Sequence, residues 1–360
     1  MILRRSFLSA LPFAALAGAA EPGAVVPSET KRFEDPTTEF VVSRLTDPAH
    51  AAWLPAFYNS AISRRGQFLL YSSERTGAAQ AYRMDLKSGV SRQLTGAKEL
   101  NAASCTLMPD EHSLCCIDGR SVVQIGLGNQ HRHEVYSVPS EYERANALGV
   151  TADGLSAAVI EEKSAGSRLR LVNLRNGEAI TLAESTDRFS DPIPRPRRAG
   201  ILYLRGAREL WLASFDATEN RQLKLAPGKL GNALWSPDGR SVLYLNVPET
   251  PGQLNSIREY TPDTNQDRLV APTSQFVCFN RNADGSVFTG ASASKASPTV
   301  LLLLRSVRRE LTLCEHRSAH PETASPIFSP NSQHVFFQGD RDGKMAIYSL
   351  PVERLVEATE

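Results

Sequence analysis

The sequence has almost no excess of charge of either sign. Its 40 lysines and arginines are balanced by 39 aspartates and glutamates, which leaves a formal net charge of +1. The chain therefore lacks the field of one sign that gathers nucleic acid or an anionic membrane surface. We predict no nucleic-acid partner, and we expect any anionic ligand to be held by a local cluster of basic side chains.

Cysteine and histidine are also scarce. The five cysteines form an odd set at irregular spacing, which excludes a disulfide framework, and most of them lie in apolar runs where buried thiols are the usual state. Only seven histidines occur, and none of them lies between His133 and His316. No histidine is therefore available for catalysis or metal binding over residues 134–315.

No apolar run is long enough to span a bilayer and remain there. The first twenty residues instead have a positive start at Arg4 and Arg5, a short apolar run over 7–16 and a small-residue end. This pattern predicts a secretory signal over 1–20, cut near Ala19 or Ala20, and a periplasmic or secreted protein with no membrane span. The stretch 4–8 also resembles the core of the bacterial twin-arginine export signal.

A repeat of roughly 44 residues is present along the rest of the chain. Residues 68–86 align without a gap on residues 334–352, so that Tyr71 falls on Phe337 and Tyr82 falls on Tyr348. Six turn signals keep the same interval, and a seventh turn without the usual residues is expected near 197–200. The six are Arg65-Gly66, Pro109-Asp110, Asp153-Gly154, Pro237-Asp238, Asp284-Gly285 and Pro330-Asn331. The chain therefore contains seven units.

Each unit contains short runs rich in β-branched and aromatic residues, bounded by glycine, aspartate and proline, which read as strands. We predict an all-β fold, a seven-bladed β-propeller of four-stranded blades over 37–352. The last blade is one strand short, and the N-terminal residues 39–45 are expected to supply that strand and close the ring. Residues 21–36 are interpreted as a flexible lead, 353–360 as a C-terminal tail, and the protein as a monomer.

Two segments carry a family resemblance beyond the general likeness of the blades to TolB-type propellers. Residues 231–239, Gly-Asn-Ala-Leu-Trp-Ser-Pro-Asp-Gly, resemble a segment of the oligogalacturonate lyases. Residues 317–322, Arg-Ser-Ala-His-Pro-Glu, followed by Pro-Ile-Phe-Ser-Pro at 326–330, resemble that family's last-blade segment. The family is a seven-bladed propeller that cleaves short pectin fragments (oligogalacturonides) by β-elimination. The resemblance implies this fold, an acidic glycan as ligand, and Mn²⁺ as cofactor.

In that family, three histidines and a glutamine hold the metal, which makes the proton beside the uronate carboxylate more acidic. By resemblance, His320 falls on one ligand histidine and Glu322 on a second, where a carboxylate still suits manganese. Asn232 falls on the third histidine, and an amide oxygen is a weaker ligand. Arg317 falls on the glutamine and cannot be a ligand, because its guanidinium stays protonated.

The family's base is a histidine, expected in the fourth blade, where this sequence has none. Two interpretations remain open. In the first, the chain is a lyase with altered machinery, in which Arg205 or a nearby lysine is the base and His320 with Glu322 keeps a metal. In the second, the propeller binds a glycan or a protein partner without catalysis, and Arg317 replaces the metal as a clamp for a carboxylate.

Overall fold

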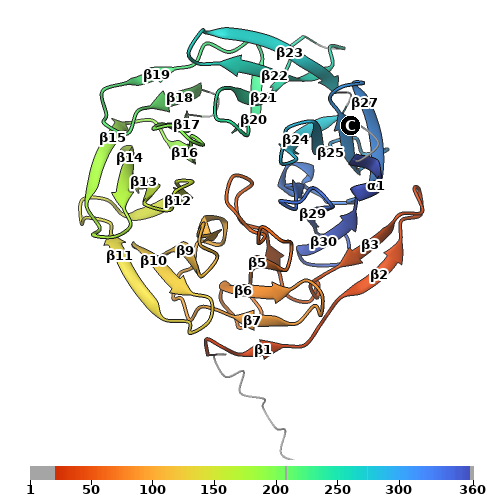
Figure 1. Ribbon diagram of the computed structural model, residues 1–360, viewed down its shortest axis with the longest axis horizontal. Coiled ribbons are helices and arrows are strands. Elements are labelled where there is room, and N and C mark those ends of the chain that lie inside the picture. Colours follow the sequence, from red (N-terminus) through yellow and green to blue (C-terminus); the bar gives the residue numbers. More distant parts are fainter. Residues whose placement is uncertain (1–20, 207–208, 251, 274, 357–360) are drawn as a thin grey trace, which may run out of the picture.

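Seven antiparallel sheets stand around a common centre (Figure 1), in a computed structural model that describes residues 21–356 except 207–208, 251 and 274. Four or five short strands form each sheet, and the sheets follow one another in chain order. The predicted all-β, seven-bladed propeller is confirmed. None of the described helices is long and apolar enough to cross a membrane.

The first four blades follow one another along the chain, and blade 1 also takes up the N-terminal strand β1. Blade 1 contains β4 (Ala52–Trp53), β5 (Phe68–Ser73), β6 (Gln80–Asp85), β7 (Ser91–Gln93) and β1 (Val25–Val26). Blade 2 contains η1 (Ala102–Ser104), β8 (Thr106–Leu107), β9 (Ser113–Asp118), β10 (Ser121–Gly126) and β11 (Arg132–Ser137). Blade 3 contains β12 (Arg144–Val150), β13 (Ser156–Lys163), β14 (Gly166–Asn173) and β15 (Ala179–Ser185). Blade 4 contains β16 (Phe189–Pro194), β17 (Ile201–Arg205), β18 (Glu209–Ala213) and β19 (Asn220–Gln222).

The last three blades complete the ring. Blade 5 contains β20 (Lys229–Trp235), β21 (Val242–Val247), β22 (Asn255–Thr261) and β23 (Gln266–Thr273). Blade 6 contains β24 (Phe276–Arg281), β25 (Val287–Ser292), β26 (Thr299–Leu304) and β27 (Arg309–Glu315). Blade 7 contains η2 (Pro321–Thr323), β28 (Ile327–Phe328), β29 (His334–Gly339), β30 (Ala346–Pro351), β3 (Val41–Arg44) and β2 (Lys31–Glu34), and α1 (Glu353–Val356) follows it.

The repeated aromatic residues of the sequence are cross-strand neighbours. Tyr71 on β5 pairs with Tyr82 on β6, and their rings stack with centroids 5.4 Å apart. Phe337 on β29 pairs with Tyr348 on β30 in the same way, at 5.2 Å. Aromatic pairs of this kind stabilise a sheet beyond the area they bury, so the repeat in the sequence marks the same contact in two adjoining blades.

The hydrophobic core is divided among the contacts between adjacent blades. Seven clusters of buried side chains fill these interfaces, one between each pair of neighbours. The unusual seventh turn lies between β16 and β17, where Arg197 has a φ of 59° in place of the usual Asp-Gly signal. The described cysteines are all free thiols, and four of the five are buried, as the sequence indicated.

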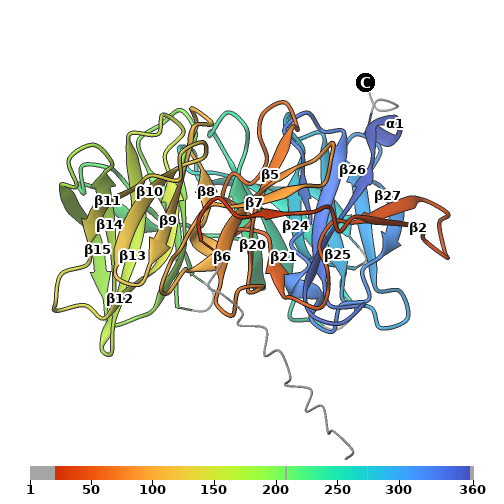
Figure 2. The same cartoon turned by 90° about the horizontal axis from the view of Figure 1, so that it is seen from below.

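The N-terminal strand closes the ring as predicted, because β3 pairs with β30 through Ser43–Ser349 and Arg44–Tyr348. The structure differs from the expectation at residues 21–36, which contain two strands in place of a flexible lead. β2 pairs with β3 on the outside of blade 7, and β1 pairs with β7 on the outside of blade 1. Figure 2 shows this segment, called the strap here (residues 25–45), running across the outside of the two blades that meet at the closure.

The segment between β4 and β5 reaches into the centre of the ring (Figure 1) and is called the plug here (residues 54–60). The Asn59 side-chain amide donates to the carbonyls of Ala103 and Leu148, both at 3.1 Å, in blades 2 and 3. From blade 6, the Asn280 amide donates to the Phe57 carbonyl at 3.1 Å. One loop of blade 1 is thus held by hydrogen bonds to three other blades.

Candidate functional site at the centre of the propeller

A small cavity of about 230 Å³ lies beside the plug, where the innermost strands of several blades meet. Its lining comes from the plug, β16, β20, β24 and the loop before β28, and consists of Phe57, Asp191, Gly231, Asn232, Val277, Cys278, Phe279, Glu322, Ser325 and Pro326. Glu322 and Ser325 also line a more apolar cavity of about 460 Å³ on the other part of the plug. We call the first space the central cavity. Among the residues that the structure describes, its lining has two carboxylates and no cationic side chain.

Asp191 is a carboxylate of the central cavity whose environment disfavours its charged form. Two residues, Asp191 and Pro192, bulge from β16 between the paired positions Ser190 and Ile193. The bulge holds Asp191 at a φ of 50°, which is unusual for a residue with a side chain and common at functional sites. Burial raises the pKa of this carboxyl to about 6. No described residue forms a hydrogen bond or ion pair with it, so burial is not offset by a partner.

Two further acidic groups sit close to these carboxylates. Burial, and then the charge of Asp191, raise the pKa of the Tyr58 hydroxyl on the plug well above its ordinary value. Burial also raises the pKa of the Cys278 thiol to about 11, with a smaller contribution from Glu322. A buried thiol in its protonated form is a poor nucleophile. Asp191, with a pKa of about 6, is therefore the group of the central cavity best suited to proton transfer near neutral pH.

Glu322 and His320 lie on the loop that leads into blade 7. The Nδ1 atom of His320 is 3.5 Å from Oε1 of Glu322, and both side chains are largely exposed, at 71% and 62%. Glu322 lines the central cavity, whereas His320 is not among its lining residues. The neighbouring His316 is fully buried: its Nδ1 accepts from the Ser318 amide at 2.9 Å, which leaves Nε2 to donate to the Ser292 carbonyl at 3.0 Å. His316 therefore has a structural role in shaping this loop.

Asn232 also lines the central cavity, but its amide is used within the fold. Its Nδ2 donates to the Phe279 carbonyl at 2.7 Å, and its Oδ1 accepts from the Phe279 N–H at 3.0 Å. The side chain therefore joins the inner strand of blade 5 to that of blade 6 as a backbone strand would. This pair of hydrogen bonds fixes the orientation of the amide.

The two arginines predicted from the sequence lie outside the lining of the central cavity. Arg205, at the end of β17, donates from Nε to Asp187 at 2.8 Å, and its guanidinium stacks over the Trp211 ring at 4.8 Å. Arg317 donates from Nε to Glu315 at 2.5 Å. Each guanidinium is thus already paired with a carboxylate of its own blade or loop.

The donor atoms do not fit a manganese ion of the kind the resemblance implies. Within the described ranges, no three residues among histidine, cysteine, aspartate and glutamate gather closely enough to hold a metal. Of the four positions, Asn232 is bonded to Phe279 and Arg317 to Glu315, which leaves His320 and Glu322 on an exposed loop. Two ligands leave most positions of a divalent ion to water.

Known proteins similar to this chain include members of the family that the sequence resembles. The family model described as oligogalacturonate lyase matches residues 22–165. An oligogalacturonide lyase of Pectobacterium atrosepticum is 24% identical over 92% of this chain and 98% of its own length. The chain is similar to the oligogalacturonate lyases over most of its length. The resemblance seen in the sequence is thereby confirmed.

Two solved oligogalacturonate lyases show the same fold. One, determined in complex with manganese, superimposes with a TM-score of 0.86 at 23% identity, covering 92% of this chain and 98% of that chain. The other, from Vibrio parahaemolyticus, has a TM-score of 0.85 at 21% identity, covering 92% and 99%. Both matches extend over nearly the whole length of the two solved structures, which shows that this chain has the same fold.

Asp191 and Tyr58 were not foreseen from the sequence. The base predicted for the fourth blade, Arg205, lies on β17, whereas the innermost strand of that blade is β16. One signal was present: Asp191 lies in Asp-Pro-Ile-Pro, and two prolines within a strand indicate a bulge or an edge. An acidic residue at such a bulge, near the centre of a propeller, is a candidate for function.

Proposed function

We propose that the protein recognises short acidic pectin fragments and does so without the metal-assisted elimination of its relatives. The similarity to the lyases over 92% of the chain supports the class of ligand. The loss of the metal is supported by the four positions that correspond to metal ligands. Two of them, Asn232 and Arg317, are bonded within the fold, and the other two lie on an exposed loop. The ligand class is thus retained from the family, whereas the reaction is not.

The observation that carries this proposal is the pair of hydrogen bonds between Asn232 and Phe279. A histidine at this position would present a ring nitrogen to a metal, whereas the amide here completes the backbone contact between blades 5 and 6. Turning it toward a metal would leave a buried N–H and a carbonyl of Phe279 without partners, which costs about 1–3 kcal/mol for each group. Manganese is therefore not part of the proposed function.

Isothermal titration calorimetry tests the ligand class directly. Trigalacturonate is titrated into the purified protein in the presence of EDTA, and the uncharged trisaccharide of galactose is the control. We expect saturable binding of trigalacturonate with EDTA present and none of the neutral sugar. Lack of binding by millimolar trigalacturonate, or binding that needs added Mn²⁺, would contradict the proposal.

Elimination by different residues is the second candidate function, and Asp191 is the observation that favours it. A carboxylate with a pKa of about 6 is a suitable base near neutral pH. It would take the proton from the carbon beside the uronate carboxylate, and the electron pair left there would form the double bond as the glycosidic C–O bond breaks. The leaving oxygen would take a proton from the Tyr58 hydroxyl, which the charge of Asp191 already influences.

The charge of the central cavity is the argument against that candidate. Its lining has Asp191 and Glu322 but no cation to hold the substrate carboxylate or the enolate. An Asp191→Asn variant separates the two functions. If the protein eliminates, this variant loses the near-ultraviolet absorbance of the unsaturated product and still binds trigalacturonate, whereas a binding protein gives no such absorbance in either form.

The proposed place of action is the periplasm or the cell exterior, where pectin fragments are encountered. The leader pattern over 1–20 supports this proposal, and that segment lies outside the described residues. Replacing both Arg4 and Arg5 by lysine in the full chain is expected to keep the protein in the cytoplasmic fraction if the twin-arginine route is used. Unchanged export of this variant would indicate an ordinary secretory route.

A further inference from the structure

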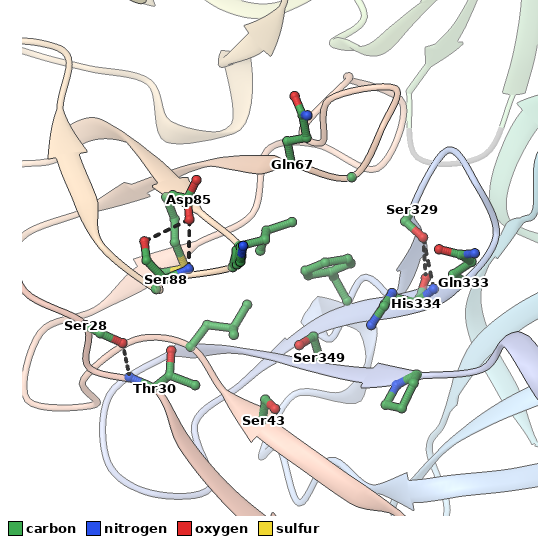
Figure 3. A pocket seen from close by; sticks show the side chains of 18 of the residues that line it. Ser28, Thr30, Ser43, Gln67, Asp85, Ser88, Ser329, Gln333, His334 and Ser349 are labelled. Carbon is green, nitrogen blue, oxygen red and sulfur yellow. Dashed lines mark hydrogen bonds between the residues drawn. The ribbon is translucent and has the colours of Figure 1, made fainter.

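A groove of about 990 Å³ lies on the outside of the ring where blade 7 meets blade 1 (Figure 3). Its walls are formed by the strap, the turn before β5, the β6–β7 turn, and strands β29 and β30. This volume is at the upper end of the range for small-molecule sites. We call it the seam groove, since it follows the closure of the propeller, away from the central cavity.

Cationic side chains dominate the ionised groups of the seam groove. The lining includes Arg32, Arg65, Arg83 and Lys87 against one carboxylate, Asp85. His334 adds no charge near neutral pH, because burial lowers its pKa. The groove therefore has an excess of about three positive charges in a protein whose formal net charge is +1.

Three of these four cations form no polar contact within the described fold, and the fourth lies over an aromatic ring. In the described part of the chain, the side chains of Arg32, Arg65 and Lys87 form no ion pair and no hydrogen bond, and Arg83 lies over the Phe68 ring at 4.3 Å. The carboxylate of Asp85 is already occupied: it accepts from the Ser88 amide and hydroxyl, both at 2.8 Å. Those hydrogen bonds, with a smaller contribution from the charge of Arg83, lower the pKa of Asp85, and among the described residues no ion pair joins this carboxylate to the groove cations.

The remaining lining is suited to a sugar. Figure 3 shows Gln67, Ser43 and Ser349 around the same opening, each on a different segment of the chain. Their hydroxyl and amide groups can both donate to and accept from sugar hydroxyls. The buried Phe336 ring and the Met84 side chain give the groove an apolar floor, on which the C–H face of a sugar ring can pack.

One wall of the seam groove is formed by the strap, which covers only blades 7 and 1, where the ring closes. Ser28 and Thr30 form this wall and pack against Gly89, where an added Cβ would come within 2.2 Å of the Ser28 hydroxyl oxygen. Beside them, both carboxylate oxygens of Glu29 lie 2.6 Å from Nη2 of Arg75. The wall is therefore held in place by a charged contact that leaves the groove cations free.

We propose that the seam groove is a binding site for acidic oligosaccharides, and this ligand class rests on the proposed function. The cations come from three separate segments, β2, the turn before β5, and the stretch from β6 to the β6–β7 turn. Separated cations match the carboxylates spaced along a uronate chain, whereas a single phosphate is best held by groups that converge. The central cavity, with two carboxylates and no cation, lacks this complementarity.

Hydrogen–deuterium exchange of the full protein locates the site. Trigalacturonate is expected to slow amide exchange in peptides covering residues 28–34, 64–67 and 84–90. The double variant Arg65→Gln/Lys87→Gln should lose this protection and bind trigalacturonate at least tenfold more weakly. The matched control is Arg175→Gln/Arg309→Gln, which removes two exposed cations, one from the β14–β15 turn of blade 3 and one from the start of β27 in blade 6, and should behave as the wild type.

Calorimetry and hydrogen–deuterium exchange together distinguish failure of this binding site from failure of the proposed function. If calorimetry shows no binding of trigalacturonate, the proposed function fails. If trigalacturonate binds but protects only the plug and residues 189–194, or if the groove variant binds as tightly as the control, the seam groove is not the site. Equal protection by inorganic phosphate would also overturn the proposal, because it would show that a lone anion suffices.

Discussion

Asn232 on β20 and Phe279 on β24 are joined by two hydrogen bonds, one in each direction. The Asn232 amide donates to the Phe279 carbonyl at 2.7 Å and accepts from the Phe279 N–H at 3.0 Å. The family resemblance assigns a metal-ligand position to Asn232, whereas the structure uses it to connect blades 5 and 6. The contact therefore stabilises the junction of two blades and, at the same time, keeps the Asn232 amide from binding a metal in the central cavity.

Replacing Asn232 by alanine tests that contact. The variant loses both hydrogen bonds and leaves the Phe279 backbone groups partly buried without partners, so we expect the free energy of unfolding to fall by about 2 kcal/mol. Chemical denaturation followed by tryptophan fluorescence measures this change. Lys229→Ala, on an exposed position of the same strand, is the control and should stay within about 0.5 kcal/mol of wild type. Equal stability of the two variants would contradict a structural role for Asn232.

Closure of the ring by β3 predicts opposite outcomes at two adjacent residues. Val42 is fully buried in the cluster between blades 6 and 7, whereas Val41 is 46% exposed on the other face of the strand. Val42→Asp places an unpaired charge in the core and should destabilise the protein by about 4 kcal/mol or more. Val41→Asp should have little effect on the midpoint of thermal unfolding. A small effect of Val42→Asp would mean that β3 does not close the ring in solution.

Because the pKa of Asp191 is raised, we expect replacement of its carboxyl to stabilise the folded protein at neutral pH but not at acidic pH. In the folded protein this carboxyl has a pKa of about 6, against an ordinary value of 3.8, because burial disfavours its charged form. Its contribution is most favourable below about pH 4 and is lost as the pH rises through 6. Asp191→Asn should therefore match the wild type near pH 4 and be more stable by about 2–3 kcal/mol above pH 7. Thermal unfolding at a series of pH values checks this, and a pH-independent difference would be inconsistent with the burial of this carboxyl.

Much of the fold is predictable from the sequence because its repeat records real contacts. Tyr71 with Tyr82, and Phe337 with Tyr348, are stacked cross-strand pairs, so the alignment of the two segments aligns the same feature of two blades. The missing strand of blade 7 also follows from the count of apolar runs. The unusual turn near 197–200 was found from the spacing alone.

The strap and the site were not predictable in the same way. β1 and β2 are two and four residues long and lie among prolines, so their local signal is weak, and they are held by pairing with β7 and β3. The role of Asp191 depends on a bulge that only the pairing of β16 with β17 reveals. The seam groove is lined by two groups of residues, 28–89 and 329–351, which lie far apart in the sequence and which no local pattern brings together.

The central claim is that recognition of acidic fragments has been separated here from metal-assisted elimination. Near-ultraviolet absorbance of the unsaturated uronate tests it most directly, with purified, folded protein given trigalacturonate in the presence of Mn²⁺ and, separately, of EDTA. We predict a flat trace under both conditions at concentrations where calorimetry shows binding. An absorbance that rises with Mn²⁺ would show that His320 and Glu322 support the family reaction after all, and would contradict the account.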